Sequence, residues 1–473
     1  MKCIQEADVI VYDNLIDISL LNYASLNTEL IYAGKEAANH YLSQGSIIEL
    51  LMDKAREGKY VVRLKGGDPY LFGRGSEEAL ALKEAGISYE IVSGVTSSIA
   101  VPAYAGIPVT DRRFVSSCHI ITAHREDEAG IDFENISKLE GTLVFMMGLA
   151  KLHHIVQGLT LHGKASDTPV AVLSDGSRYN RRKCVGTLAD IEEKVKEAKL
   201  LPPAIIVVGE VVSLSNELDN FLERYSDKKL FRKKILLTGT RYICNKIKVA
   251  LADEGCDIDE ISIIESVPIE SDFYNNIEKY IESHDYLVFS SANGIRVFFE
   301  KLKELHNVDL RKLSNIKFAV IGKGSAQTLR NYGYIADFVP SSFSNKDLAV
   351  ELCKQLKGEK LLLLRAREAS AELVEELEAN KVEYTDVPLY ETFRDYRRTF
   401  DIKRLIKNYD YVVVASSITA HTLCEMVEDK ALLEGRVVSI GPVTTGTCKR
   451  LGVEPLMSAR EYSVDGIVRV LLQ

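Results

Sequence analysis

Short runs of apolar and β-branched residues recur along the chain, separated by longer segments with the periodicity of amphipathic helices. The apolar runs predict strands at residues 7–12, 60–64, 119–122, 142–146, 204–208, 234–237, 286–290 and 411–414. The helical patterns cover residues 47–57, 76–85, 191–199, 245–254 and 371–379. Strands that alternate with helices of this length are typical of the α/β class, so we expect parallel sheets with helices packed on their faces.

One charged stretch interrupts this alternation. Residues 223–233 (ERYSDKKLFRK) have no clear period and carry charges of both signs. Such composition is typical of a boundary between domains. We therefore predict a first domain at residues 1–222, a linker at 223–233 and a second domain at 234–473.

The second domain repeats itself. Three blocks recur in the same order: KILLTGTR at 234–241 and KLLLLRAR at 360–367, DYLVFSS from 285 and DYVVVASS from 410, and FAVIGKGS from 318 and VVSIGPVT from 437. We interpret this as a duplication, because chance similarity between generic α/β segments rarely keeps the order of three blocks. Each half is expected to form its own βαβαβ lobe, and the polar strand ends would then line a cleft between the lobes.

Composition narrows the class of protein. The 473 residues are 46% hydrophobic and 27% charged, which is ordinary for soluble domains, and no apolar run approaches the length of a membrane span. The net charge of -9 argues weakly against nucleic acid or an anionic membrane as partner. The eight cysteines are scattered without CxxC pairs, and no secretory signal precedes them, so we expect a cytoplasmic protein with reduced thiols and no metal site.

Polar residues collect at the predicted strand ends of the first domain. Asp13 is the last residue of ADVIVYD, Lys35 is the last residue of LIYAGK, and residues 66–69 (GGDP) follow VVRLK. The carboxyl ends of parallel strands are where α/β proteins bind ligands, and paired glycines let a ligand approach the backbone. Taken singly, Asp13 is more often a helix cap and Lys35 a solvated charge. The pattern is neither GxGxxG nor a phosphate-binding P-loop, so a dinucleotide site is not indicated.

The order of these motifs resembles that of uroporphyrinogen-III C-methyltransferases. The resemblance runs over almost all of residues 1–222 through RLKGGDPYLFGRGSEE, SGVTSS, AYAGIPVTDRR, VFMMGL, PVAVLSDGS and PPAIIVVGEVV. It implies a dimeric class III tetrapyrrole methylase fold of two α/β subdomains, with S-adenosylmethionine as methyl donor. The family's cofactor contacts fall on Gly66, Gly67, Asp68, Leu71, Thr96, Ser97, Met147, Gly176 and Ala204.

The same resemblance implies roles in catalysis. Asp13 matches the family's proposed proton acceptor and Lys35 its proposed proton donor. The substrate carries eight carboxylates that need cations, for which the candidates are Arg63, Arg74, Arg112 and Arg113. Two successive methylations would give precorrin-2, a precursor in siroheme and cobalamin biosynthesis.

One departure from the family concerns the start of the chain. The family opens with a strand and a GxGPGD loop before the helix that leads into ADVIVYD, whereas this sequence begins inside that helix. We interpret this as a start codon assigned too late or a truncated gene. Without that strand, a neighbouring strand edge should be unpaired and apolar surface exposed.

The second domain resembles uroporphyrinogen-III synthase through TGTR, FSSANGI, AVIGKGSAQTL, VPLYET, VVASSIT and SIGPVTTGTCKRLG. The resemblance implies a bilobed, duplicated α/β fold that closes hydroxymethylbilane to uroporphyrinogen III without a cofactor. Tyr390 matches the tyrosine proposed to assist loss of the hydroxyl group. Polar residues expected to bind the substrate are Arg241, Ser291, Ser417 and Thr444.

Two alternatives stay open at the level of sequence. The first domain could serve another precorrin, or an RNA or diphthine substrate, and the second could be a non-catalytic binding domain. The fusion favours the tetrapyrrole interpretation, because the synthase would make the substrate that the methylase consumes. The partners expected are therefore small-molecule tetrapyrroles and a second copy of the chain.

Overall fold

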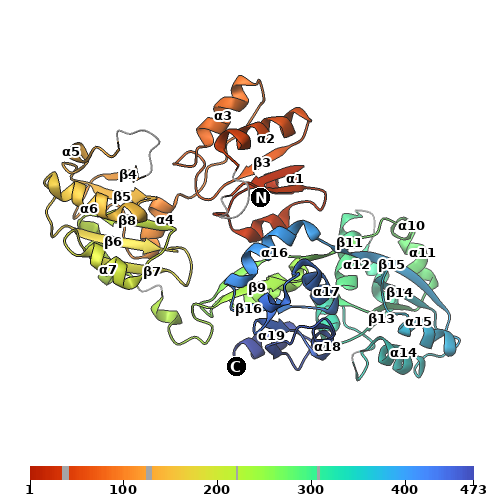
Figure 1. Ribbon diagram of the computed structural model, residues 1–473. Coiled ribbons are helices and arrows are strands. Elements are labelled where there is room, and N and C mark those ends of the chain that lie inside the picture. Colours follow the sequence, from red (N-terminus) through yellow and green to blue (C-terminus); the bar gives the residue numbers. More distant parts are fainter. Residues whose placement is uncertain (35–41, 124–129, 220–221, 306–308, 343) are drawn as a thin grey trace.

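The structure is a computed structural model that describes residues 1–34, 42–123, 130–219, 222–305, 309–342 and 344–473. Within these ranges the strands form four sheets, two in each half of the chain (Figure 1). Most predicted strands and helices are present within a few residues of the expected bounds. The pairing between strands departs from expectation in two places.

The first sheet is parallel, with the order β2 (Glu29–Tyr32), β1 (Val9–Tyr12), β3 (Val61–Leu64). Alternate residues of a strand point to opposite faces, and both faces of β1 are buried. Val9 and Val11 pack against α2 (Gln44–Arg56), while Ile10 and Tyr12 belong to a core on the other face. The other helices here are α1 (Lys2–Glu6), the 3₁₀ helix η1 (Ile18–Tyr23), α3 (Gly75–Glu84) and α4 (Ser97–Tyr104).

The second sheet has the order β4-β5-β8-β6-β7, and the expectation of a parallel sheet is wrong for most of it. Only β4 and β5 run parallel, whereas β8 is antiparallel to both of its neighbours and β7 is antiparallel to β6. The short hairpin between β6 and β7 leaves no room for a crossover helix. The strands are β4 (Cys118–Thr122), β5 (Thr142–Met146), β6 (Pro169–Ser174), β7 (Arg182–Thr187) and β8 (Ala204–Val208). The helices are α5 (Phe133–Ile136), η2 (Leu149–Lys151), α6 (Leu152–Leu161), α7 (Ile191–Ala198), η3 (Glu210–Leu214), α8 (Ser215–Leu218) and η4 (Glu223–Tyr225).

The two sheets of the second half have matching strand orders, which supports the predicted duplication. One sheet is β10-β9-β16-β17-β18; the other is β15-β14-β12-β13, extended at one end by an isolated bridge at Phe338 and at the other by antiparallel β11. The strands are β9 (Lys234–Thr238), β10 (Asp257–Glu260), β11 (Ile264–Pro268), β12 (Tyr286–Phe289), β13 (Lys317–Val320), β14 (Leu361–Ala366), β15 (Tyr384–Arg394), β16 (Tyr411–Val414), β17 (Val437–Ser439) and β18 (Met457–Ser458).

The expectation that each repeat forms its own lobe is wrong. Strand β9 of the first repeat pairs with β16 of the second, and β10 joins the same sheet by pairing with β9. Likewise, β14 of the second repeat pairs with β12 of the first, and β15 pairs with β14. The chain crosses between the lobes after β10 and again after β15, where Asp395 donates its backbone N–H to the carbonyl of Ile263 at 2.9 Å. Repetition in sequence reveals equivalent strands but not which copy each one joins.

Helices complete both lobes. They are α9 (Arg241–Ala250), α10 (Asp272–Asn275), α11 (Ile277–Ser283), α12 (Ala292–Glu304), η5 (Leu310–Asn315), α13 (Lys323–Asn331), α14 (Asn345–Cys353), α15 (Glu372–Ala379), η6 (Tyr396–Arg398), α16 (Thr399–Leu405), η7 (Ile406–Asn408), α17 (Ser417–Met426), η8 (Lys430–Leu433), α18 (Pro442–Arg450) and α19 (Val464–Leu471). Figure 1 shows α16 between the first sheet and the lobe that contains β9 and β16.

A single hydrophobic core joins the two halves of the chain. Ile10 and Ile18 from the first half lie in the same buried cluster as Ile263, Ile402 and Ile406 from the second. One face of β1 is therefore covered jointly by α1 and η1 of the first half and by residues of the second half.

The segment predicted as a linker is packed rather than free. Tyr225 is 3% exposed and its ring lies edge-on to Tyr179 at 5.0 Å, while Leu230 is 1% exposed within the core around β9. The proposed boundaries at 222 and 234 remain predictions.

Candidate functional site

Asp13 lies at the carboxyl end of β1 and is held by Arg63 from β3. Nη2 of Arg63 donates to Oδ2 of Asp13 at 3.0 Å, and Nη1 donates to the carbonyls of Val11 and Leu64. Oδ1 of Asp13 accepts the backbone N–H of Leu15 at 3.0 Å. Arg63 was predicted to bind substrate, but in the structure its guanidinium fixes the position of the Asp13 carboxylate.

A buried carboxylate extends this network. Glu78 of α3 is 6% exposed, and its Oε1 lies 3.0 Å from Nζ of Lys65 and 3.5 Å from Nε of Arg63. Burial lowers the pKa of Lys65, and the neighbouring Arg63 lowers it further, against the opposing effect of Glu78. Lys65 and Glu78 were not predicted as site residues, although Lys65 stands in the RLKGGDP motif and Glu78 in GRGSEE.

The glycine-rich loop after β3 is tied to the segment that precedes α4. Asp68 accepts from the backbone N–H of Tyr70 at 2.9 Å, from the hydroxyl of Ser93 at 2.8 Å and from the backbone N–H of Gly94 at 2.9 Å. These bonds, the one from Gly94 foremost, lower the pKa of Asp68. Asp68 was predicted to contact a ligand, and its carboxylate instead organises the loop that carries Gly66, Gly67 and Leu71.

The loop approaches its neighbour so closely that side chains are excluded. A Cβ atom on Gly94 would lie 2.1 Å from the carbonyl oxygen of Gly67. Gly67 itself has φ +78°, a left-handed conformation that favours glycine, and a Cβ there would meet nothing closer than the carbonyl oxygen of Val95 at 3.9 Å. The exposed backbone of Gly67 therefore faces open space beside residue 95.

Helix α4 connects this loop to the second subdomain. Thr96 is its N-cap, accepting from the backbone N–H of Ser98, and Ser97 is its first residue. On the same helix Val101 packs so tightly against Gly176 that a Cβ on Gly176 would lie 2.2 Å from it. Val101 lies five residues after Thr96, a rise of about 7.5 Å along the helix.

Met147, Gly176 and Ala204 lie at one edge of the second sheet. Ser174 pairs with Ala204 and Met146 pairs with Ile205, so the register brings the ends of β5 and β6 to the start of β8. Met147 and the residue before Gly176, Asp175, have φ +55° and +50°, and Met147 is 52% exposed. Strained backbone of this kind concentrates at functional sites.

The outer edge of β3 carries no partner strand among the described residues. Residues 87–95 belong to no helix or strand, and Tyr89, Val92 and Val95 are 44%, 61% and 77% exposed.

The other arginines predicted to bind substrate in the first half are either paired with carboxylates or exposed. Arg74 forms a two-pronged ion pair with Glu77 at 2.8 and 2.9 Å, and Arg113 is bound to Asp111 in the same manner at 2.9 and 3.2 Å. Arg112 is exposed. Lys35 lies outside the described residues.

In the second half, Tyr390 and Ser291 come together. Their hydroxyl oxygens lie 2.9 Å apart, where β15 passes the end of β12. Burial raises the pKa of Tyr390, against smaller opposing effects of Ser291 and Arg296, so the phenol is protonated at neutral pH.

The other polar residues predicted for this half are more dispersed. The hydroxyl of Ser417 accepts from Thr447 at 3.0 Å, and Thr444 is 1% exposed, with a buried hydroxyl that has no partner in the described part of the chain. Arg241 turns to the first half, where it donates to the carbonyl of Asn22 at 2.9 Å and its guanidinium lies over the ring of Tyr23.

Tyr462 is a further candidate, which was not predicted from the sequence. It is 64% exposed, its ring lies beside Gly441, and its hydroxyl donates to the carbonyl of Ala415 at 3.4 Å. No motif in the sequence marks it.

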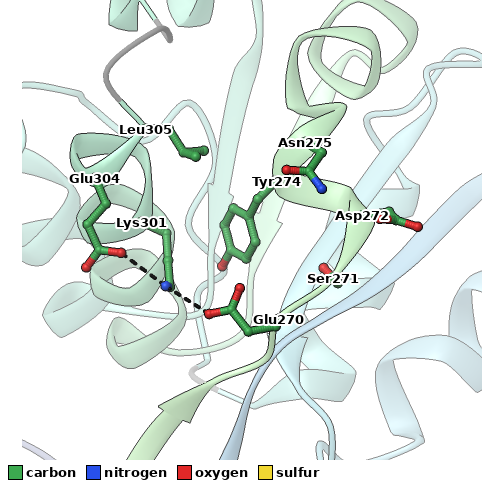
Figure 2. A pocket seen from close by; sticks show the side chains of 8 residues that line it. All are labelled: Glu270, Ser271, Asp272, Tyr274, Asn275, Lys301, Glu304 and Leu305. Atoms are coloured by element: carbon green, nitrogen blue, oxygen red, sulfur yellow. Dashed lines mark hydrogen bonds and ion pairs between the residues drawn. The ribbon is translucent and has the colours of Figure 1, made fainter.

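One surface depression lies apart from all these residues. It has a volume of about 450 Å³ and is lined by Tyr274 and residues of α10 and α12. Figure 2 shows Lys301 in it between two carboxylates, Glu270 at 3.1 Å and Glu304 at 3.0 Å. The depression is open, and its charged side chains pair with one another, so nothing indicates a binding or catalytic site there.

Comparison with known proteins identifies a family for each half of the chain and a relative that spans both halves. The model of the family "Tetrapyrrole (Corrin/Porphyrin) Methylases" matches residues 1–192, and that of "Uroporphyrinogen-III synthase HemD" matches residues 245–469. The "Porphyrin biosynthesis protein HemD" of Ruminiclostridium josui is 35% identical over 479 aligned positions, covering 100% of this chain and 94% of that protein. The chain belongs to this family of fused tetrapyrrole methylases and uroporphyrinogen-III synthases.

Relatives of the methylase half are also known alone. The uroporphyrinogen-III C-methyltransferase of Methanocaldococcus jannaschii is 49% identical over 216 residues, 45% of this chain and 89% of that protein. A uroporphyrin-III C-methyltransferase of Thermus thermophilus, solved with S-adenosylhomocysteine, is 32% identical with a TM-score of 0.39 and covers 45% of this chain and 90% of its own.

The methylase half presents groups of the kinds that S-adenosylmethionine, the cofactor expected from the sequence, would need. The exposed left-handed Gly67 backbone, the capping hydroxyl of Thr96 and the exposed Met147 offer backbone, polar and apolar contacts. Among the described residues, no group of three or more His, Cys, Asp or Glu side chains is arranged to hold a metal ion, and no helix has the length and apolarity of a membrane span.

Proposed function

We propose that the chain closes hydroxymethylbilane to uroporphyrinogen III and methylates this product twice to precorrin-2. The observation that supports the methylase part is the continuity from Gly67 through α4 to Gly176, along which one ligand would contact strand ends of both subdomains. S-adenosylmethionine, once bound, would supply the methyl group as a sulfonium.

The protein's own part in methylation is to position the ring carbon and move protons. Asp13 would accept the proton that the pyrrole carbon loses after methylation, and its carboxylate is oriented by Arg63 at 3.0 Å. Lys35 would be the proton donor. The substrate's carboxylates would exchange places with Glu77 and Asp111 on Arg74 and Arg113, whose ion pairs are exposed and therefore weak, or bind the exposed Arg112.

In the synthase half, the protonated phenol of Tyr390 would assist departure of the bilane's hydroxyl group. Ser291 at 2.9 Å can relay or orient that proton. Ser417 and Thr444 would bind side chains of the bilane, and Arg241 would do so only if it released the carbonyl of Asn22. This half is proposed to need no cofactor.

Three further properties are part of the proposal. The resemblance to the methylase family favours a homodimer formed through the methylase half, a cytoplasmic location, and tetrapyrroles rather than nucleic acid as substrates. Light scattering on the full chain tests the first of these, with a mass of one chain as the contradicting result.

The decisive experiment supplies hydroxymethylbilane and methyl-labelled S-adenosylmethionine to the full chain. The expected products are uroporphyrinogen III, followed by species carrying one and two labelled methyl groups. Cyclisation without label would leave only the synthase part of the proposal standing. If hydroxymethylbilane is not cyclised, but uroporphyrinogen III supplied directly becomes labelled, only the methylase part of the proposal stands.

A further inference from the structure

The synthase half contacts the methylase on both sides of Asp13. Tyr12, the residue before it, donates its hydroxyl to Asp401 of α16, at 3.1 Å from each carboxylate oxygen. Asn14, the residue after it, accepts from the guanidinium of Arg404 on the same helix. The residue proposed as proton acceptor is therefore flanked by two contacts with the other enzyme.

The contact between Tyr12 and Asp401 is buried, whereas the one at Asn14 is exposed. Tyr12 is 2% exposed and Asp401 is fully buried, and Asp401 also accepts from Nε of Arg398 at 3.2 Å and from Arg404 at 3.4 Å. Arg398 in turn donates to Oδ1 of Asn22 and to the carbonyl of Ile18 at 3.2 Å. Hydrogen bonds to charged, water-excluded groups are strong and directional.

The hydroxyl of Tyr12 is a dependable donor. Burial and the neighbouring Asp401 carboxylate both hold the pKa of Tyr12 well above its usual value. The phenol therefore keeps its proton at any pH at which the protein works, and the bond to Asp401 does not depend on titration.

We propose that helix α16 of the synthase half positions the methylase's Asp13, with Asp401 and Arg404 as positioning residues that act through Tyr12 and Asn14. The proposal rests on the methylase function proposed above. A methylase of this family that stands alone lacks these contacts and must hold the same loop by other means. In this chain, the geometry of methyl transfer depends on the fold of the cyclising enzyme.

The test compares Tyr12→Phe with Tyr409→Phe in the full chain. Tyr409 is a matched control, because it is 4% exposed and its hydroxyl also donates to a carboxylate of the same interface, the partly buried Asp259 at 2.9 Å, away from Asp13. Each substitution removes one hydroxyl and leaves the aromatic packing. Thermal unfolding shows whether the two variants lose similar stability.

Two readouts decide. Hydrogen exchange of the peptide that covers residues 10–16 should speed up in Tyr12→Phe and not in Tyr409→Phe. The kcat of methyl transfer should fall about tenfold in Tyr12→Phe alone, with KM for S-adenosylmethionine and the cyclisation rate unchanged, because a small misplacement of a reacting group costs this much.

Equal exchange at residues 10–16 in both variants overturns the proposal, as does an equal loss of kcat. If the unaltered chain transfers no methyl group, the proposed methylase function fails, and the exchange readout still decides whether α16 holds the loop.

Discussion

Replacing Asp401 by Asn should destabilise both halves of the chain together. The substitution keeps the shape of the side chain but removes the charge that faces Arg398 and Arg404. Arg398 is 1% exposed, so its guanidinium would remain buried without a carboxylate. Breaking a buried ion pair in this way costs about 3–5 kcal/mol of the free energy of unfolding.

The lower end of that range applies here. Arg398 keeps two neutral acceptors, Oδ1 of Asn22 and the carbonyl of Ile18. A loss of about 3 kcal/mol lowers the melting temperature of the whole chain by roughly 3 °C, because its unfolding entropy is about 1 kcal/mol/K. Because four sheets need not unfold in one step, the assay is thermal unfolding combined with hydrogen exchange of strands β1 and β16, which share the core between the halves.

Glu428→Gln is the matched control. Glu428 pairs with Lys403 of the same helix at 2.6 Å, but the two side chains are 83% and 45% exposed, so the loss should stay below about 1 kcal/mol. If Asp401→Asn costs no more than this control, or if β1 and β16 lose protection at different temperatures, the shared core does not couple the two enzymes.

Three other substitutions test individual parts of the site. Tyr390→Phe should slow cyclisation about 100-fold, because it removes the hydroxyl that donates the proton. The control Tyr384→Phe removes an exposed hydroxyl bonded to a carboxylate in the same lobe and should not slow cyclisation; equal rates in the two variants would exclude Tyr390 as the acid. Gly176→Ala places a methyl group 2.2 Å from a side-chain carbon of α4 and should weaken binding of S-adenosylmethionine in calorimetry, while Gly45→Ala meets nothing closer than 3.7 Å and should bind normally. Burial raises the pKa of Glu265, so its ionisation opposes folding once the pH has risen above the ordinary range of a carboxyl group; Glu265→Gln should therefore stabilise the protein in thermal melts at pH 8 more than at pH 4, and the opposite order would contradict this sign.

Local pattern was enough to locate most strands and the glycine-rich loop. The runs at β5, β8 and β16 are apolar and bounded by polar residues, and the structure reproduces their predicted bounds or nearly so. Which strands pair with one another could not be predicted from such local patterns. Strands β9 and β14 are equivalent in sequence, and nothing within either one specifies that it joins the other repeat's sheet.

For the candidate site too, part could be predicted from local sequence and part is set by the fold. The motif RLKGGDP indicated where a ligand would touch backbone, but the partners of its charged residues are set by the fold. Arg63 binds Asp13, 50 residues away, and Tyr12 binds Asp401, 389 residues away. A charge that appears available in the sequence is therefore often committed in the structure, as Arg241 also shows.

The exchange of strands between the repeats bears on how such a molecule can arise. A single repeat, folded alone, would present β9 and β10 with no β16 beside them and leave β12 without β14. Two free copies could satisfy each other only by trading these strands across a twofold axis. An ancestor with one repeat would accordingly have been an intertwined dimer, and gene duplication would have turned that dimer into one chain that folds without waiting for a partner.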